Sequence, residues 1–197
     1  MRRFCIFIFV FVLASSLLWT GTEEVKNSRI SISGGAYFLR DDVFKQVYGN
    51  HAWIVCGGYS YRLPFLLKNH LEVGVNFRFL SDKGKLTVTK EPVDLVMSDV
   101  TLTVKYLFDL NPIIPYAGPG LQYIWYKEEY PPLFPVSSVR GSVAGLSFQA
   151  GCYYDFSSSL GIDVSVLYCL ARAEEGMVQT DIGGIGIKAG MVYRFDF

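Results

Sequence analysis

The sequence is poor in charge, and the charge that it has is balanced. Only 18% of its 197 residues are charged, and 18 basic residues match 18 acidic ones, for a net charge of zero. Nucleic-acid-binding proteins carry a basic surface, and disordered chains contain few apolar and aromatic residues. Here 51% of the residues are hydrophobic and 16% are aromatic. The composition therefore argues against both classes and predicts a single folded domain without a nucleic-acid partner.

Long apolar runs are missing after the N-terminus. Met1-Arg2-Arg3, the apolar run Phe4–Leu13 and the small residues of Ala14–Ser16 are together typical of a signal peptide. We predict that residues 1–22 form this peptide, with cleavage between 16 and 22; an uncleaved helical anchor is the alternative. No later segment approaches the roughly 18 apolar residues of a membrane helix. The exported protein is then either soluble or a β-barrel.

Cysteine is also scarce. Of the four cysteines, Cys5 is lost with the predicted signal peptide, and the other three are widely spaced. This spacing matches neither a disulfide framework nor a metal-binding motif. We expect Cys56, Cys152 and Cys169 to be small buried or lipid-facing thiols, and we expect no metal or cofactor.

What the sequence does contain is alternation. The segment Ile185–Phe197 places apolar side chains at every odd position and, apart from Val192, small or charged ones between them. A strict period of two predicts a β-strand with one apolar face, here long enough to cross a bilayer at a tilt. Further segments alternate in the same way: Arg29–Leu39, Ala52–Leu63, Leu71–Leu80, Val96–Asp109, Ile114–Tyr126, Ser142–Phe156 and Leu160–Leu170.

The connections between these strands are alternately long and short. Transmembrane barrels have an even number of strands, short periplasmic turns and longer extracellular loops. We therefore predict an all-β fold over residues 28–197, an eight-stranded antiparallel up-and-down transmembrane β-barrel preceded by the signal peptide. The last strand is expected to pair with the first and close the barrel. The predicted extracellular loops are residues 40–50, 81–95, 127–140 and 172–181.

Soluble barrels alternate too, so the apolar face must be assigned. One face of each predicted strand carries mainly Leu, Val, Ile, Phe, Tyr and Trp, and the other is dominated by Gly, Ser, Thr, Asn and Gln. The interior of an eight-stranded barrel is narrow, which favours the small polar side chains inside. On the apolar face, aromatic residues gather near both ends of the strands, like the girdles at the two membrane interfaces. We therefore predict that the apolar face contacts lipid.

Over about Ser28–Phe197 the chain is similar to the small OmpA/OmpX-type barrels, in particular to the outer membrane protein β-barrel domain family of Gram-negative bacteria. A terminal signature supports the resemblance: a polar residue, then glycine, then spaced aromatics, at Lys188, Gly190, Tyr193, Phe195 and Phe197. The resemblance implies that the barrel-assembly machinery recognises these residues. It also implies a monomer in the outer membrane, in contact with lipid and lipopolysaccharide. Unlike full-length OmpA, the sequence is expected to have no peptidoglycan-binding domain after the barrel.

Charged residues interrupt the predicted inner face: Glu72, Arg78, Asp99, Lys105, Asp163, Lys188 and Arg194. Unpaired charges in a narrow lumen are costly, so we expect ion pairs. Glu72 and Asp163 are expected to meet Lys105, Lys188 and Arg194 near the short turns. Arg78 and Asp99 are expected to meet nearer the long loops. We interpret this network as a structural plug; a gated ion path through rearranged pairs is the alternative.

The predicted function is a structural or surface-interaction barrel. Exposed loop charges, such as Lys83, Lys85 and Lys90 against Glu128 and Glu129, could bind an extracellular ligand, or they could simply keep the surface solvated. Beside the gated channel, a third hypothesis is a lipid-A-modifying enzyme, since some barrels of this size use His and Ser for that chemistry. The two histidines, His51 and His70, fall at opposite ends of the predicted barrel, and no Gly-x-Ser-x-Gly motif occurs. We therefore predict a non-enzymatic protein.

Overall fold

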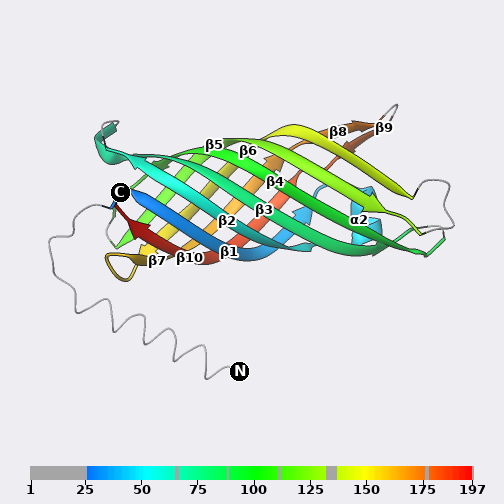
Figure 1. The fold of residues 1–197 in the computed structure, drawn as a ribbon, viewed down its shortest axis with the longest axis horizontal. Helices are drawn as coiled ribbons and strands as arrows, with labels where there is room; N and C mark the ends of the chain where they lie inside the picture. Colours follow the sequence, from blue (N-terminus) through cyan, green and yellow to red (C-terminus); the bar gives the residue numbers. More distant parts are fainter. Residues whose placement is uncertain are drawn as a thin grey trace, which may run out of the picture.

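The computed structural model describes residues 26–64, 67–87, 89–110, 112–131, 137–175 and 178–196. Within them, eight strands form a closed antiparallel barrel in the order β1-β10-β7-β6-β5-β4-β3-β2 (Figure 1). Each barrel strand pairs with the barrel strands that precede and follow it in the chain, so the topology is up-and-down. The predicted fold class is confirmed. The predicted signal peptide and Phe197 lie outside the described residues.

The barrel consists of β1 (Ser28–Leu39), β2 (Ala52–Leu63), β3 (Leu71–Lys85), β4 (Pro92–Leu107), β5 (Ile113–Glu129), β6 (Ser138–Asp155), β7 (Leu160–Leu170) and β10 (Gly184–Phe195). The connections contain the helix α2 (Asp42–Tyr48), the 3-10 turn η1 (Leu67–Asn69), and the separate hairpin of β8 (Arg172–Glu175) and β9 (Val178–Asp181). Among the described residues, no helix is long and apolar enough to cross a membrane.

The first and last barrel strands close the wall. β1 and β10 pair without interruption from Ser28↔Phe195 to Leu39↔Gly184. We call the end near Ser28 and Phe195 the terminal end, and the opposite end, which carries α2 and the β8–β9 hairpin, the loop end. The predicted pairing of the last strand with the first is confirmed. Because the backbone groups of both strands are paired, the barrel presents no open edge at this seam.

The outer wall is apolar. Large hydrophobic side chains point away from the barrel and are exposed on strand after strand, as Ile32 (65%), Trp53 (72%) and Leu121 (64%) illustrate. Aromatic side chains gather toward the loop end in Phe38, Trp53, Phe77, Phe79, Tyr123, Trp125 and Tyr168, and toward the terminal end in Tyr106, Phe108 and Tyr193. Such a continuous apolar surface is unfavourable in water and suits the hydrocarbon core of a bilayer between two aromatic girdles.

The interior differs from the prediction of a uniformly polar lumen. Toward the terminal end it is polar, but toward the loop end the inward side chains form an apolar cluster of buried residues that includes Tyr37, Leu39, Ile54, Leu80, Leu95, Met97 and Ile124. The interior is apolar there because α2 covers the loop end of the barrel. Phe44 and Val47 of α2 pack against this cluster, so the inward side chains of the cluster do not face water. Apolar residues are then favoured there.

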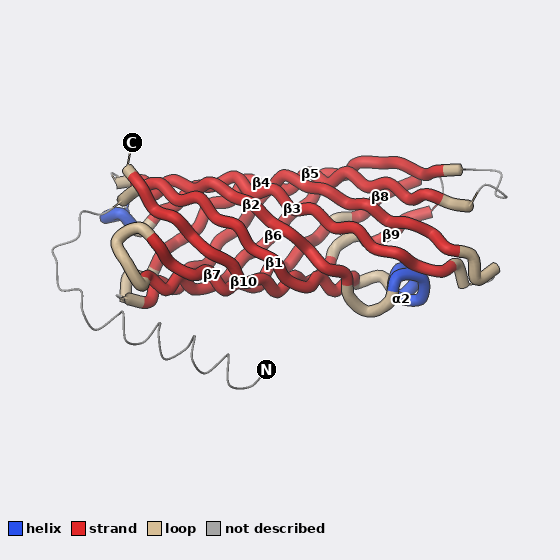
Figure 2. The backbone as a smooth tube through the Cα atoms, turned by 60° about the horizontal axis from the view of Figure 1, so that its bottom comes forward, coloured by secondary structure: helices blue, strands red, loops and turns tan. Residues whose placement is uncertain are grey.

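The barrel strands continue into two of the predicted loops, 81–95 and 127–140. The β3–β4 ladder continues to Lys85↔Pro92 and the β5–β6 ladder to Glu129↔Ser138. In contrast, the β2–β3 ladder ends at Ile54↔Leu80 and the β6–β7 ladder at Leu146↔Leu170. Four strands therefore rise beyond the rest of the barrel rim as the β3–β6 wall, which extends past α2 in Figure 2.

The sequence analysis predicted these strands too short, because the outward side chains of the β3–β6 wall are no longer apolar beyond the aromatic girdle. Its outward positions become charged at Lys83, Asp94, Lys127 and Arg140, while inward positions such as Leu95 remain apolar or half-buried. On the outside of this wall charged residues replace the lipid-facing apolar ones, and the inside is largely apolar apart from Asp82 and Glu128. The alternation persists, but its apolar face has changed from the outside to the inside of the sheet.

The predicted loop 40–50 contains α2, which the sequence prediction missed. Asp41 caps the helix, because its carboxylate accepts hydrogen bonds from the backbone amides of Val43 (2.7 Å) and Phe44 (3.4 Å). The C-terminal turn lies directly on β3, where a Cβ at Gly84 would stand 2.5 Å from the Val47 carbonyl oxygen. The fourth predicted loop, 172–181, is likewise wrong in detail, since it forms the β8–β9 hairpin.

Candidate functional site

Glu72 of β3 is the centre of the polar interior toward the terminal end. Its side chain is fully buried and pairs with Arg29 of β1 and, at 3.3 Å, with Lys105 Nζ of β4. The Tyr153 hydroxyl of β6 donates to Glu72 Oε1 at 3.0 Å and accepts from Lys105 Nζ at 2.9 Å. One carboxylate thus joins four strands across the lumen.

A second group of contacts surrounds Asp163 of β7. The Tyr116 hydroxyl donates to Asp163 Oδ1 at 2.7 Å, and Gln149 Nε2 donates to the Tyr116 hydroxyl oxygen at 2.9 Å. The rings of Tyr116 and Tyr153 stack with their centroids 4.5 Å apart, which links this group to the one around Glu72. Large aromatic side chains therefore fill the centre of the lumen, where the sequence analysis expected small polar side chains.

The third group lies nearer the loop end. Arg78 Nε pairs with Asp99 Oδ2 at 2.5 Å, and Thr101 Oγ1 donates to Asp99 Oδ1 at 3.0 Å. The Arg78 guanidinium lies over the Tyr37 ring, 4.3 Å from its centroid. This contact marks the border between the polar interior and the apolar cluster beneath α2.

Not every predicted pair forms. Arg194 pairs with Asp155 at 3.0 Å, and not with Glu72 or Asp163 as predicted, because β10 brings it to the turn after β6. Lys188 is buried, yet within the described part of the chain no carboxylate oxygen lies within 4.0 Å of its ammonium group. Arg29 was missed, although its position next to the outward Ile30 places it on the inner face.

Between these groups almost no space remains. The cavity lined by Arg29, Lys105, Tyr153, Asp163 and Lys188 has a volume of only about 10 Å³. This is close to the minimum that one water molecule needs. The polar half of the lumen is therefore packed shut.

The fold does not bring the two histidines together. His51 precedes β2 at the loop end, and His70 precedes β3 at the terminal end. No group of three or more His, Cys, Asp or Glu side chains that could hold a metal ion occurs among the described residues. Cys56 and Cys169 are buried free thiols, and Cys152 is a half-buried one.

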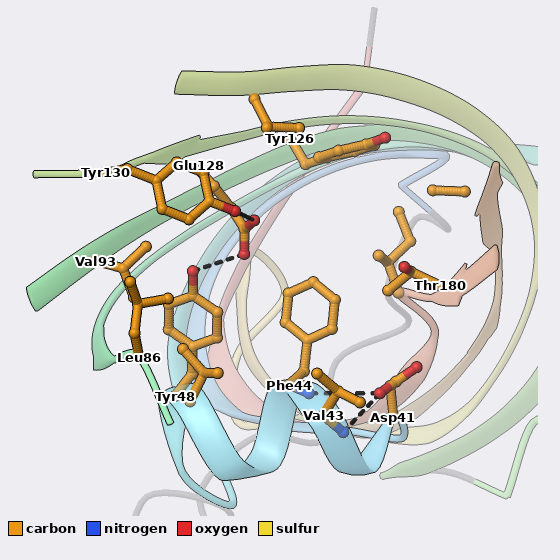
Figure 3. A pocket seen from close by; sticks show the side chains of 14 residues that line it. Asp41, Val43, Phe44, Tyr48, Leu86, Val93, Tyr126, Glu128, Tyr130 and Thr180 are labelled. Carbon is orange, nitrogen blue, oxygen red and sulfur yellow. Dashed lines mark hydrogen bonds between the residues drawn. The ribbon is translucent and has the colours of Figure 1, made fainter. Parts of the chain in front are cut away.

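One feature absent from the sequence predictions is a pocket at the loop end, which we call the α2 pocket. It has a volume of about 320 Å³ and lies between α2, the inner face of the β3–β6 wall and the β8–β9 hairpin (Figure 3). Its lining residues are Asp41, Val43, Phe44, Val47, Tyr48, Leu86, Val93, Tyr126, Glu128, Tyr130, Val139, Ala173, Thr180 and Ile182.

Glu128 is the polar centre of the α2 pocket. Its carboxylate accepts hydrogen bonds from the hydroxyls of Tyr48 (2.7 Å) and Tyr130 (2.8 Å), as Figure 3 shows. Burial, reinforced by the neighbouring Glu128 carboxylate, raises the pKa of Tyr48 far above its ordinary value, so this hydroxyl stays protonated and donates. Alternation on β5 could have indicated this site, because Ile124, Tyr126 and Glu128 share the inner face.

A closed barrel with an apolar wall, two aromatic girdles and a packed polar interior is the architecture of a transmembrane β-barrel. No curated protein matches the chain in sequence. Residues 9–195 match the outer membrane protein beta-barrel domain, and the chain belongs to this family. Its location is therefore the bacterial outer membrane.

Solved structures of small outer-membrane barrels have the same fold. Neisserial surface protein A matches with a TM-score of 0.62 at 16% identity, covering 85% of this chain and 96% of that one. OprG from Pseudomonas aeruginosa matches with a TM-score of 0.63 at 13% identity, covering 89% of this chain and 98% of that one. Ail, the attachment invasion locus protein of Yersinia pestis, matches with a TM-score of 0.54 at 18% identity, covering 87% of this chain and 100% of that one.

Proposed function

We propose that this protein is a non-conducting, non-enzymatic, monomeric outer-membrane barrel whose loop end faces the cell exterior and interacts with molecules there. The observation that supports this proposal most strongly is the double closure of the lumen. Ion pairs and stacked tyrosines fill the polar half, leaving a void of about 10 Å³, and α2 with its apolar cluster covers the other half. A channel would need both closures to open.

The shape of the loop end supports the surface role. Beyond Phe79 and Trp125 the β3–β6 wall carries charges of both signs on its outer side, at Lys83, Asp94 and Lys127. From Phe79 to Lys85 the strand extends about 20 Å. A polar, hydrogen-bonded sheet of this length above an aromatic girdle is suited to water and to contact with an extracellular molecule.

Conductance tests the non-conducting part of this proposal. Purified protein in a planar bilayer should give no stepwise current, while an open porin inserted in the same way serves as the positive control. Sustained ohmic current from the wild-type protein would contradict the proposal and favour the gated channel.

Surface labelling tests the orientation. A membrane-impermeant maleimide added to intact cells should label Lys85→Cys, at the tip of β3, and not Ser158→Cys, in the short turn before β7. The wild type is the control for the native thiols, of which Cys56 and Cys169 are buried. Labelling of Ser158→Cys alone would place the loop end in the periplasm.

We further propose structural and assembly roles for the residues singled out in the sequence. The packed interior would be stabilised by its charged residues, Glu72, Arg78, Asp99, Lys105, Asp163, Lys188 and Arg194. Lys188, Gly190, Tyr193, Phe195 and Phe197 would be recognised by the barrel-assembly machinery, and the outer wall would contact lipid and lipopolysaccharide. A test is the amount of folded barrel in the outer membrane after Tyr193→Ser and Phe195→Ser, compared with Phe38→Ser on the same outer wall; equal loss would refute the assembly role.

A further inference from the structure

The α2 pocket combines aromatic walls with an excess of negative charge. Phe44, Tyr48, Tyr126 and Tyr130 contribute rings, and the carboxylates of Asp41 and Glu128 belong to the lining. No Lys, Arg or His side chain is among the described residues that line it. The volume of about 320 Å³ lies at the lower end of the range of small-molecule sites in proteins, roughly 300–1,000 Å³.

The two carboxylates of the pocket differ in how their charge is compensated. Asp41 sits at the start of α2, where backbone amides of Val43 and Phe44 and the amide of Asp181 (3.3 Å) donate to it. Among the described residues, the hydrogen bonds to the Glu128 carboxylate come from the neutral hydroxyls of Tyr48 and Tyr130. Its cross-strand neighbours are the apolar Leu95 and Val139. In the described part of the chain, no cationic nitrogen lies within 4.0 Å of Glu128.

A third carboxylate adds to the negative potential. Asp82 of β3 lies across from Leu95, two strands from Glu128 on the same inner face, and it acts on Tyr48 electrostatically. Its Oδ2 atom is buried and, within the described residues, has no hydrogen-bond partner. Burial raises the pKa of this carboxyl, and the nearby His51 only partly opposes that rise. A further positive charge in the pocket would favour the ionised form of such a partly buried carboxyl.

We propose that the α2 pocket binds a small organic cation with an apolar body, with its ammonium group at the Glu128 carboxylate and its apolar part against Phe44 and the neighbouring tyrosine rings. Carboxylate and aromatic faces together attract a cation more strongly than either does alone. The same two features disfavour an organic anion. This binding goes beyond the proposed surface role and does not depend on whether the lumen conducts.

Three probes of one shape test the charge preference. Phenethylammonium, phenethyl alcohol and phenylacetate carry a positive, a neutral and a negative group on the same aromatic body. Calorimetric titration is performed on the full barrel in nanodiscs of a zwitterionic phospholipid, with empty nanodiscs as the blank. We expect saturable binding of the ammonium compound, binding of the alcohol about tenfold weaker, and none of phenylacetate.

Two variants at adjacent positions of β5 separate the pocket from the general surface charge. Glu128→Gln keeps the size and an acceptor for Tyr48 but removes the charge, so it should weaken ammonium binding about tenfold and leave alcohol binding unchanged. Glu129→Gln is the matched control, because Glu129 is exposed and pairs with Lys127 outside the pocket. Glu129→Gln should change neither the binding of the ammonium compound nor the binding of the alcohol.

A third variant tests the location. Val139→Trp would fill the pocket and should abolish binding of both compounds, provided that heat-modifiable mobility on gels shows the barrel to be folded. The inference is overturned if no probe binds saturably, if phenylacetate binds as well as the ammonium compound, or if Glu129→Gln weakens binding as much as Glu128→Gln. None of these results affects the surface-labelling test, so failure of this inference is distinguishable from failure of the proposed function.

Discussion

At the scale of single residues, Glu72 pairs with two cations at once, Arg29 and Lys105, in a region without bulk water. Glu72→Gln keeps the shape of the side chain but leaves both cations without their carboxylate. We expect a loss of about 3–5 kcal/mol in the free energy of unfolding. Urea unfolding in lipid vesicles measures it, with the exposed Glu129→Gln as a control that should change stability by less than about 0.5 kcal/mol. A loss as small as that of the control would show that Glu72 is not stabilising.

Gly35 lies where two barrel strands approach closely. A Cβ at this position would be 1.9 Å from the carbonyl oxygen of Ile187 on β10, whereas a Cβ at the neighbouring Gly34 would meet its nearest atom at 3.6 Å. The clashing oxygen belongs to the backbone of a paired strand, so it cannot move away from the added Cβ without disturbing the β1–β10 pairing. We expect Gly35→Ala to destabilise the barrel by at least about 1–3 kcal/mol and Gly34→Ala to be nearly neutral, as measured by the midpoint of urea unfolding. Equal midpoints for the two variants would contradict this account.

At the scale of elements, α2 depends on its cap. Asp41→Ala removes the acceptor for the amides of Val43 and Phe44, at a cost of about 1 kcal/mol to the helix. We expect hydrogen exchange at these two amides to become about fivefold faster, with no change in the global unfolding midpoint, because the barrel wall does not require α2. Asp42→Ala is the control, since this fully exposed residue caps no amide. Unchanged exchange in Asp41→Ala would refute the capping role.

The strands were predictable from the sequence, whereas α2 and the ends of the strands were not. Lipid on one side and a narrow lumen on the other require outward apolar and inward small or polar side chains to alternate along each strand. The sequence analysis therefore located the central part of all eight barrel strands. A seven-residue helix has no such signature, because isolated helices this short are unstable and depend on packing. Phe44, Val47 and Tyr48 do form one apolar face, but only the Gly84 contact and the apolar cluster explain why that face is buried.

The same limit applies to the two candidate sites. The alternation of inward and outward positions along the strands correctly placed Arg78 opposite Asp99. It could not place Arg194, whose partner Asp155 is the last residue of β6. The α2 pocket is built from separate segments of α2, β5, β6 and the β8–β9 hairpin. These residues are brought together by the register of the β3–β6 wall and by the packing of α2 and the hairpin against it, and the alternation on β5 indicates only one side of the pocket.

At the scale of the whole molecule, the closed seam should make the barrel resistant to detergent. We expect the unboiled protein to migrate faster than the boiled protein on SDS gels of the outer-membrane fraction. A chain that ends after Gly183 lacks β10, so β1 and β7 lose their partner and the shift should disappear. A shift that persists in this truncated chain would show that the remaining strands close without β10.

The seam also constrains the time course of assembly. β1 and β10 are the barrel strands most distant in sequence, yet they are hydrogen-bonded neighbours along their entire length. Contacts of such large sequence separation form late and slowly. Until they form, two rows of amides and carbonyls would face hydrocarbon, where nothing can solvate them. A half-inserted barrel is therefore a high-energy intermediate, and folding and membrane entry must proceed as one concerted event.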